Sequence, residues 1–566
     1  MATKPATTQK EPVIVVGGGL AGLVAAYELS QRNVPVIIVD QENEGSLGGQ
    51  AFWSLGGIFM VNSSYQRFCG VKDNRELAHR DWTNSAGFDR EDDFWPRQWA
   101  KAFVDFATDE MESYVKGLGM GFMFNVGWAE RGAGSSDGHG NSVPRFHLTW
   151  GTGPEVVRVF AEPVKKAAEK GLIQFKFRHQ VDELIIDEAT GRAVGIKGSI
   201  LEADDAARGV KTSRTVIDKF ELRGSSVLIS SGGIGGNVDL VKKSWPKERF
   251  SGHVPEHFVV GVPAHVDGRM VGISETAGAN IINRDRMWHY TEGLKNWNPI
   301  WPNHGIRILP APSSLWLDAK GKRLPAFLYP GSDTLATLKY ICSTGYDYTW
   351  FILDESIIAR EFALSGSEQN PDITGKSVWK LLTQRIFSKK GTVPVQNFQK
   401  HGQDFVVRDT LEELVEGMNE LAKEQNGPTL TVEEVKAVIE SRDSQFDNVY
   451  TKDAQAMLIN NARSYWPDKL SRVAAPHKIL GNKPLIAVRL NLVTRKTLGG
   501  IETNLQSNVM RADKTPFPGL YAAGEVAGFG GGGVHGYNAL EGTFLGGCIF
   551  SGRAAGRAMA EEYLAN

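Results

Sequence analysis

The chain has 566 residues, of which 41% are hydrophobic and 23% are charged, and its formal net charge is −2 at pH 7. This composition is typical of a globular protein, and the length exceeds what one hydrophobic core usually supports, so we expect two or three domains. A near-neutral charge does not favour nucleic acid or an anionic membrane surface as a partner. No apolar run approaches the roughly twenty residues that a transmembrane helix requires.

The cysteines and the N-terminal residues indicate the cellular compartment of the protein. Cys69, Cys342 and Cys548 lie far apart and form no zinc-binding or redox pair, so no metal site is expected. We interpret them as reduced, buried thiols of a cytoplasmic protein. Residues 1–11 are polar and lack the apolar core of a signal peptide, so they are predicted to be a disordered leader.

The first sixty residues carry a nucleotide-binding pattern. An apolar run at 13–16 leads into Gly-x-Gly-x-x-Gly at 17–22, and apolar residues then recur at helical spacing over 23–29. A second apolar run at 36–39 ends on Asp40. A strand, a glycine turn, a helix, a second strand and an acid, in this order, predict a dinucleotide site.

Each glycine of this turn has a separate physical role. Gly17 permits the sharp turn after the strand, and Gly19 lets the backbone approach a pyrophosphate held at the helix N-terminus. Gly22 allows close packing of the helix on the sheet, and Asp40 can accept both ribose hydroxyls. The neighbouring positions expected to contact the cofactor are Leu20, Ala21 and Gln41.

Three further glycine-containing segments identify the dinucleotide. They lie at 48–57, 227–237 and 519–525, and the last is a short apolar run that closes on Gly-Glu. Together with the first motif, these segments resemble the flavoprotein family of fumarate reductase, succinate dehydrogenase flavoprotein subunits and 3-ketosteroid Δ1-dehydrogenase. The resemblance implies an FAD enzyme of the α/β class. Its Rossmann-like FAD-binding domain would be of the glutathione-reductase type, with an inserted α+β cap domain.

The resemblance also implies the domain boundaries and the cofactor contacts. Residues 1–299 and 491–566 would form the FAD-binding domain, and 300–490 the cap. A histidine that binds FAD covalently in succinate dehydrogenases is replaced by Gln50, so FAD is expected to be non-covalent. The other implied contacts are Gly48, Gly49, Ser54, Gly56, Gly57, Val181, Ser231, Gly232, Gly233, Gly524, Glu525, Gly542, Thr543 and Leu545.

Local patterns predict several further elements. We expect a helix over 155–170, a strand over 173–177 and a hairpin over 181–197. Two charged amphipathic helices are predicted at 410–424 and 431–441. The Gly-, Ser- and Asp-rich residues 131–153 read as a loop or hairpin excursion, in which His139 and His147 are interpreted as surface or structural histidines rather than catalytic ones.

The substrate end departs from the fumarate reductases. Those enzymes carry Asn-Arg-Leu-Gly-Gly, whose arginine grips a carboxylate, whereas this chain has Asn-Ala-Leu-Glu-Gly at 538–542. Their histidine before a later glycine turn is replaced here by Arg495 or Lys496. A dicarboxylate would find its charge poorly paired, so fumarate and succinate are not expected. A reductase of unsaturated acids that uses Arg495 and Lys496 as a clamp remains the alternative.

Tyr537 lies close to the position of a tyrosine in the ketosteroid dehydrogenases. A phenol there could polarise a ketone oxygen, and His535 could act as a base or orient the phenol. The alternative is a packing tyrosine and a structural histidine. Further candidates are Arg284, Arg286, His289 and Tyr290.

The resulting hypothesis is an FAD enzyme that removes or adds two hydrogens across a C–C bond beside a carbonyl. Its small-molecule substrate would be a steroid or another cyclic ketone. A flavin-binding protein that has lost catalysis is the alternative from another class. No residue pattern names the electron acceptor.

Overall fold

A six-stranded sheet forms the base of the nucleotide-binding lobe. The computed structural model describes residues 10–132 and 140–565. Its strand β1 (Val13–Val16) lies in parallel between β2 (Val36–Asp40) and β10 (Val227–Ile229). The sheet is completed by β6 (Ile173–Phe177), β22 (Pro516–Ala522) and β21 (Asn508–Met510) in the order β21-β22-β10-β1-β2-β6. Because the carboxyl ends of parallel strands share one edge, the turns after β1, β2, β10 and β22 meet there.

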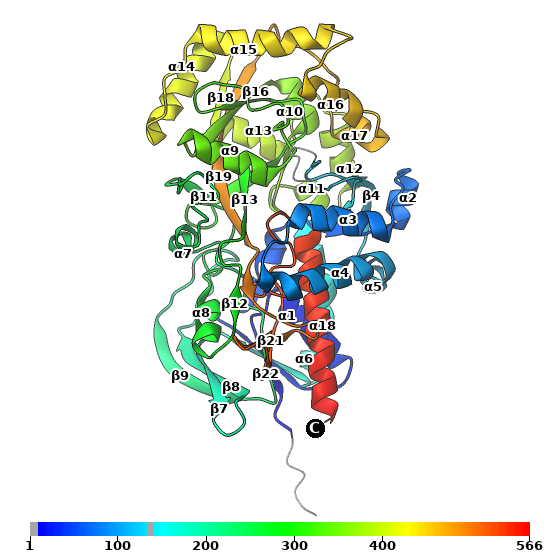
Figure 1. Ribbon diagram of the computed structural model, residues 1–566, viewed down its shortest axis with the longest axis vertical. Helices are drawn as coiled ribbons and strands as arrows, with labels where there is room; N and C mark the ends of the chain where they lie inside the picture. Colours follow the sequence, from blue (N-terminus) through cyan, green and yellow to red (C-terminus); the bar gives the residue numbers. More distant parts are fainter. Residues whose placement is uncertain (1–9, 133–139, 566) are drawn as a thin grey trace, which may run out of the picture.

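Two helices pack closely beneath this edge. α1 (Leu20–Ser30) follows β1 and is almost wholly buried, and α18 (Thr543–Ala565) runs beside it through the lobe (Figure 1). Their contact depends on glycine, because a Cβ on Gly552 would lie 2.5 Å from the carbonyl oxygen of Ala21. A Cβ on Gly556 would likewise lie 2.7 Å from the carbonyl oxygen of Ala25. Side chains at these positions would push the two helices apart.

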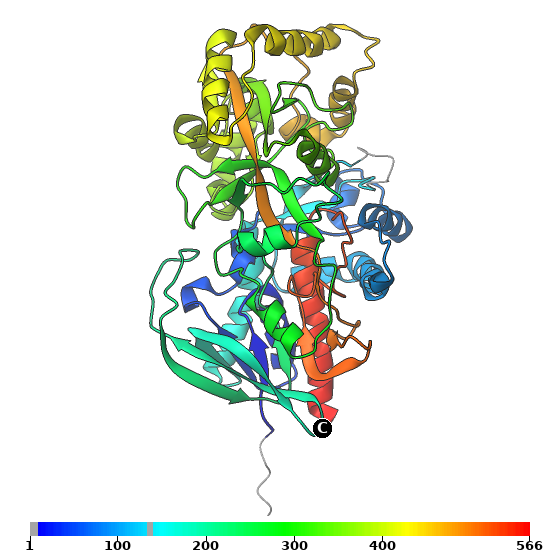
Figure 2. The same cartoon turned by 60° about the vertical axis from the view of Figure 1, so that its left-hand side comes forward.

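An eight-stranded sheet connects this lobe with the upper one. Its centre is the long strand β19 (Leu485–Thr497), which pairs antiparallel with β13 (Met287–Lys295) and β16 (Tyr348–Asp354). Figure 2 shows β19 in orange running from the upper lobe down to the nucleotide-binding lobe. The remaining strands are β11 (Phe258–Val260), β14 (Gly305–Leu309), β15 (Leu315–Asp318), β17 (Ala363–Leu364) and β18 (Phe405–Arg408).

Helices cover the outside of both lobes (Figure 1). The upper lobe carries α9 (Thr334–Thr344), α10 (Glu355–Glu361), α11 (Pro371–Thr374), α12 (Val378–Leu381), η4 (Leu382–Ile386), α13 (Val393–His401), α14 (Leu411–Ala422), α15 (Val432–Ser444), α16 (Ala454–Ala462) and α17 (Trp466–Ser471). The lower lobe carries α2 (Ser64–Phe68), α3 (Arg75–Ala86), α4 (Phe94–Asp109), α5 (Met111–Gly117), α6 (Thr152–Glu169), α7 (Val238–Lys243) and α8 (Arg269–Thr276).

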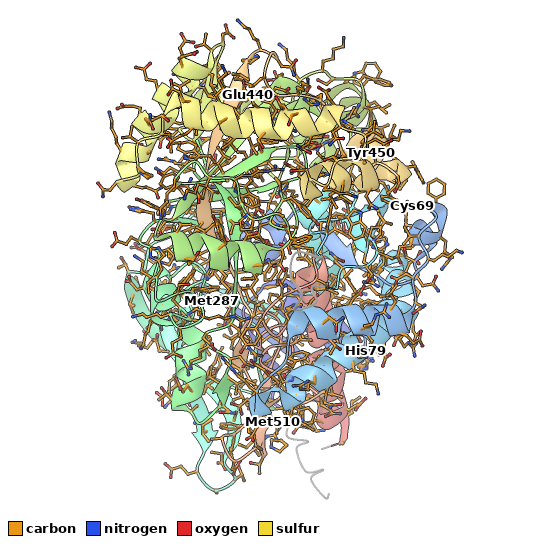
Figure 3. All side chains as sticks on the ribbon, turned by 45° about the horizontal axis from the view of Figure 1, so that its top comes forward. Cys69, His79, Met287, Glu440, Tyr450 and Met510 are labelled. Atoms are coloured by element: carbon orange, nitrogen blue, oxygen red, sulfur yellow. The ribbon has the colours of Figure 1, made fainter. Side chains whose placement is uncertain are left out.

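The two lobes have separate hydrophobic cores. The main core of the lower lobe draws most of its buried residues from 13–173 and 493–560, whereas the upper core lies within 294–490. In Figure 3 Glu440 and Tyr450 lie on the upper lobe, and Met287 and Met510 lie below them. On the basis of these cores we propose a division into an FAD-binding domain and a cap. Residues 1–9 of the predicted leader lie outside the described residues.

Most of the local predictions are confirmed. The strand at 173–177, the hairpin of β7 (His179–Asp187) and β8 (Arg192–Leu201), the helix at 155–170 and the two helices α14 and α15 are present. Of the loop or hairpin excursion predicted at 131–153, the later part holds β5 (Phe146–Thr149), which pairs antiparallel with the strand before the segment, and the start of α6. β5 pairs with β3 (Gly57–Phe59) and β4 (Phe122–Gly127). Because contacts with these partner strands stabilise β5, its own four residues show no clear β-strand pattern.

The two histidines of that segment have different outcomes. His147 is buried in β5, where its ring nitrogen Nε2 lies 2.6 Å from the Ser63 hydroxyl and Nδ1 contacts backbone carbonyls. It is therefore structural. His139 lies outside the described residues. Within residues 10–132 and 140–565, no helix combines the length and apolar character needed to cross a membrane, and no cluster of His, Cys, Asp or Glu is arranged to hold a metal ion.

Candidate active site

A long cavity begins at the edge of the six-stranded sheet and reaches the upper lobe. It contains about 1610 Å³ of open space, part of which is continuous with solvent. Its walls come from the turns after β1, β2, β10 and β22, from the start of α18, and from β13, β14 and β19.

The turn after β1 forms an open cradle at the N-terminus of α1. Gly17 has φ +105°, which is left-handed and favours glycine, and its Cβ would lie 2.6 Å from the carbonyl oxygen of Ser230. A Cβ on Gly19 would meet nothing closer than that same oxygen, at 3.8 Å. Gly19 therefore borders open space in front of a helix N-terminus, as a phosphate group requires. Gly22 does not line the cavity, because its Cβ would overlap the carbonyl oxygen of Gly17.

The nucleotide end of the cavity is polar. Asp40 ends β2, where its carboxylate accepts hydrogen bonds of 2.8 Å from the backbone N–H groups of Gly18 and Glu42. Burial raises the pKa of Asp40, and these hydrogen bonds oppose the shift. Arg269 donates to the carbonyl oxygen of Val181 at 3.2 Å. Further polar residues that line this end, and that no sequence motif indicates, include His179, Gln180, His265, Asp267 and Arg269.

Farther along the cavity from the nucleotide end, the walls are glycine turns and the side-chain amide of Gln50. Gln50 donates through Nε2 to the Glu525 carboxylate at 2.5 Å, and Thr497 donates its backbone N–H to the same carboxylate at 2.8 Å. Burial raises the pKa of Glu525. The Gln50 Oε1 atom is buried and has no hydrogen-bond partner among the described residues, so an N–H of a flat polar ring could satisfy it. α18 begins beside Gly542, which lines the cavity.

Most of the predicted contact positions line this one cavity. They are Gly17, Gly19, Leu20, Ala21, Asp40, Gln41, Gly48, Gly49, Gln50, Ser54, Gly56, Gly57, Val181, Ser231, Gly232, Arg495, Gly524, Glu525, Gly542 and Leu545. Gly233 and Thr543 lie behind the lining. A Cβ on Gly233 would lie 2.5 Å from Glu525, and the Thr543 hydroxyl bonds the carbonyl oxygen of Leu540. A backbone cradle at a helix N-terminus, a carboxylate at the end of the second strand and an unpaired amide oxygen together fit FAD.

A charged cluster closes the upper end of the cavity. The guanidinium of Arg307 pairs with Glu541 at 2.5 Å and also lies 3.5 Å from Glu130 and 3.7 Å from Glu292. It stacks 3.7 Å from the ring centre of Tyr290. Tyr290, Arg307 and Glu541 all line the cavity. Burial raises the pKa of Glu292 to about 7, although Arg307 opposes this shift.

Tyr290 presents a free hydroxyl at this end. No hydrogen bond joins the hydroxyl to any residue that the structure describes. Burial and the Glu541 carboxylate raise the pKa of Tyr290, so the phenol stays protonated. Arg495 and Lys496 line the same region. The Arg495 guanidinium donates to the carbonyl oxygen of Gly261 at 2.7 Å, and burial, followed by Arg495, lowers the pKa of Lys496 to about 8.

The structure places Tyr537 away from the cavity. Its hydroxyl donates to Asp89 at 2.9 Å, and its ring lies 3.4 Å from the guanidinium of Arg249 and 4.0 Å from that of Arg286. Tyr537 does not appear among the cavity-lining residues of the described chain. Its side chain is therefore engaged by charged groups from other segments, and the expectation that it meets a substrate carbonyl does not fit this arrangement.

His535 also lies outside the cavity. Its ring is buried and stacked on Trp82 at 5.4 Å, with Phe529 and Phe544 on its other sides. Burial lowers the pKa of His535 to about 3, and neither ring nitrogen has a hydrogen-bond partner among the described residues. Phe544 separates His535 from the cavity, which Phe544 itself lines. A histidine in this apolar enclosure has no path to a reacting proton.

Only Tyr290 among the further candidates reaches the cavity. Successive residues of a strand point to opposite faces, so His289 of β13 packs on the far side, 5.0 Å from the ring of Trp245. Arg286 forms a buried ion pair with Asp93 at 2.5 Å, and Arg284 pairs with Glu275. Glu541, Arg307 and Phe146 were not predicted as site residues. Arg307 and Phe146 belong to strands that the sequence did not reveal.

Comparisons with known proteins agree with this geometry. The family model described as an FAD binding domain matches residues 12–545. A KsdD-like steroid dehydrogenase of Mycolicibacterium smegmatis is 58% identical over 536 residues, which cover 94% of this chain and 96% of that protein. Another, from Mycobacterium tuberculosis (strain CDC 1551 / Oshkosh), is 57% identical over 552 residues, which cover 97% of this chain and 95% of that protein.

One solved structure shares the fold along the whole chain. It is the 3-ketosteroid Δ1-dehydrogenase from Sterolibacterium denitrificans in complex with 1,4-androstadiene-3,17-dione, with a TM-score of 0.65 and 15% sequence identity. The match covers 98% of this chain and 100% of that one. The chain therefore belongs to the family of FAD-binding oxidoreductases that includes the KsdD-like steroid dehydrogenases, and it is an FAD-dependent enzyme.

Proposed function

We propose that this enzyme removes two hydrogens across a C–C bond beside the carbonyl of a steroid or another polycyclic ketone, or adds them back. The observation that carries the proposal is the free, protonated hydroxyl of Tyr290 at the charged end of the cavity. The names of the relatives support the substrate class, since they are steroid dehydrogenases at more than half sequence identity.

The cofactor would be held along the whole cavity. Gly17, Gly19 and the N-terminus of α1 would bind the pyrophosphate, and Asp40 the ribose. Gln50 and the N-terminus of α18 would face the ring system, whose reduced form carries negative charge that a helix N-terminus stabilises. When bound, FAD supplies the hydride acceptor. The remaining chemistry falls to side chains of the chain itself.

Tyr290 would polarise the ketone. Its hydroxyl can donate a hydrogen bond to the carbonyl oxygen and stabilise the enolate that forms when the neighbouring C–H loses its proton. Arg307 stacks on the Tyr290 ring and fixes its orientation. We propose Tyr290 in place of Tyr537 for this role, because Tyr290 lines the cavity and the Tyr537 hydroxyl is bound to Asp89.

Glu541 would accept the proton. It lines the cavity, and its carboxyl group lies 2.5 Å from the guanidinium of Arg307. Arg307 also lies near two further acids, Glu130 and Glu292, so three carboxyl groups share one guanidinium. The raised pKa of Glu292, about 7, means that this cluster can hold a proton near neutral pH.

An anaerobic titration tests the proposal. A 3-oxosteroid should bleach the flavin absorbance, whereas unsaturated carboxylic acids should not restore the colour of the reduced enzyme. Reoxidation by such acids would favour the alternative reductase, in which Arg495 and Lys496 clamp a carboxylate, since both line the cavity. If no ketone from a broad panel bleaches the flavin, the proposed reaction is wrong. The cytoplasmic location stays a prediction.

A further inference from the structure

A second cavity adjoins the first on the side of the upper lobe. It contains about 1120 Å³ of open space, part of which is continuous with solvent, and its walls come from β4, β5, α10, α11, α12, η4 and α17. Leu55, Phe146 and Leu309 line both cavities. These three apolar side chains therefore form the junction between the two spaces.

The junction lies next to the charged cluster around Arg307. Arg307 and Leu309 belong to β14 two residues apart, so their side chains share a face of the strand about 7 Å apart. Arg307 marks the end of the cavity at which Tyr290 would bind the ketone, and Leu309 already belongs to the second cavity. A rigid molecule with its carbonyl at Tyr290 would therefore extend past Leu309 and reach the second cavity with its far end.

The arginines that line the second cavity are already hydrogen-bonded to the protein, and Arg360 donates to the carbonyl oxygen of Leu470 at 2.5 Å. Arg385 donates to Asp372 at 2.6 Å and to Asn370 at 2.8 Å. Arg472 donates to the backbone carbonyl oxygens of Glu361 and Leu309. What remains for a ligand is mainly the apolar wall of Met123, Phe124, Leu148, Phe362, Ala363, Ile373, Leu381 and Ile386.

The mouth of this cavity is also apolar. Phe124 is 45% exposed and stacks on Trp466, which is 41% exposed, with their rings 6.2 Å apart. Phe68 packs edge-on against the same Trp466. A contiguous group of exposed aromatic side chains marks a place where an apolar ligand or partner can bind. This wall continues the apolar lining outward.

We propose that the second cavity binds the aliphatic side chain of a steroid whose ketone lies at Tyr290. The substrates would then be 3-oxosteroids that keep a long hydrocarbon side chain rather than those from which it has been removed. This inference rests on the proposed function. Its physical basis is that a long apolar tail gains affinity of roughly fourfold for each methylene buried, and the second cavity offers that burial.

Two substrates and two variants test the inference. The purified FAD-loaded enzyme is assayed with cholest-4-en-3-one and with androst-4-en-3-one, which has the same ring system without the side chain. We expect kcat/KM to be at least about tenfold higher for cholest-4-en-3-one, because several methylenes become buried. Leu381→Trp fills the second cavity and should lower this ratio below about threefold, while kcat/KM for androst-4-en-3-one stays within about threefold of wild type.

Val378→Trp is the matched control. Val378 lies on α12 three residues before Leu381 and is 60% exposed, outside the cavity lining. The control should keep the wild-type ratio and so account for any effect of a tryptophan on this helix. Two outcomes would overturn the inference and leave the proposed function standing. One is an equal kcat/KM for the two ketones in the wild-type enzyme. The other is a Leu381→Trp enzyme in which kcat/KM falls by the same factor for both ketones. No bleaching by either ketone would instead overturn the proposed function, and the inference with it.

Discussion

Two glycines of the same turn should fail in different ways when they are given a side chain. Gly19 has φ −73°, which any residue adopts, and its Cβ would meet only the Ser230 oxygen at 3.8 Å. A Cβ on Gly22 would overlap the Gly17 oxygen and lie 2.7 Å from the hydroxyl of Ser230 and 3.1 Å from Val15. Gly19 therefore borders ligand space, whereas Gly22 is enclosed by protein.

The free energies of unfolding separate the two cases. Gly19→Val should change the stability of the apoprotein by no more than about 0.5 kcal/mol, since it adds methyl groups to open space. Its side chain would occupy the position of the pyrophosphate, so the variant should purify without flavin. Gly22→Ala should lower the stability of the apoprotein by about 3 kcal/mol, the upper end of what overpacking usually costs.

Denaturant unfolding with and without added FAD is the assay. At a hundredfold excess over its Kd, FAD should stabilise the wild-type protein by about 2.7 kcal/mol and leave Gly19→Val unchanged. A Gly19→Val protein that retains stoichiometric FAD would refute the assignment of the phosphate cradle. An apoprotein of Gly22→Ala as stable as wild type would refute the packing argument.

Three further predictions concern the ring end of the cavity. Tyr290→Phe should slow single-turnover flavin reduction about a hundredfold, whereas Tyr537→Phe should leave the rate nearly unchanged; the reverse result would return the role to Tyr537. His535 has a pKa of about 3 when folded and 6.5 when unfolded, so the stability that its neutral form contributes is lost as pH falls from 6.5 towards 3. In His535→Phe, the free energy of unfolding measured by urea titration should fall less steeply below pH 6.5, by up to about 1.4 kcal/mol per pH unit. An unchanged pH dependence of this free energy would contradict the prediction. Acid precipitation should release all flavin into the supernatant, because Gln50 offers no nucleophile; colour on the pellet would show a covalent bond.

The sequence predicts the cofactor-facing turns well because their requirements are local. Gly17 needs a left-handed backbone, Gly19 needs open space, and Asp40 needs only to end a strand next to them. The positions of these residues relative to one another in the sequence are enough to indicate all three conditions. The helices α14 and α15 were predictable for the same reason, since the period of their apolar residues is visible within a dozen positions.

The substrate end could not be predicted in this way because distant segments build it. Tyr290 and His289 are adjacent in sequence, and only the pairing of β13 with β19 decides which one faces the cavity. Tyr537 has a suitable hydroxyl, but Asp89 and Arg249, which engage it, come from segments nearly three hundred residues or more away in sequence. Phe146 lies on a strand whose partners are β3 and β4, and no local period reveals it.

The packing of α18 bears on when the cofactor can be acquired during synthesis. α18 contacts α1 through Gly552 and Gly556, and the Ser551 hydroxyl accepts a hydrogen bond of 2.9 Å from the backbone N–H of Gly524, in the turn that leads to Glu525. The turn after β1 emerges from the ribosome early, yet its supporting helix is translated more than five hundred residues later. Nascent chains that stop before residue 543 should therefore bind FAD poorly, and loading of the flavin becomes a late event in the maturation of the protein.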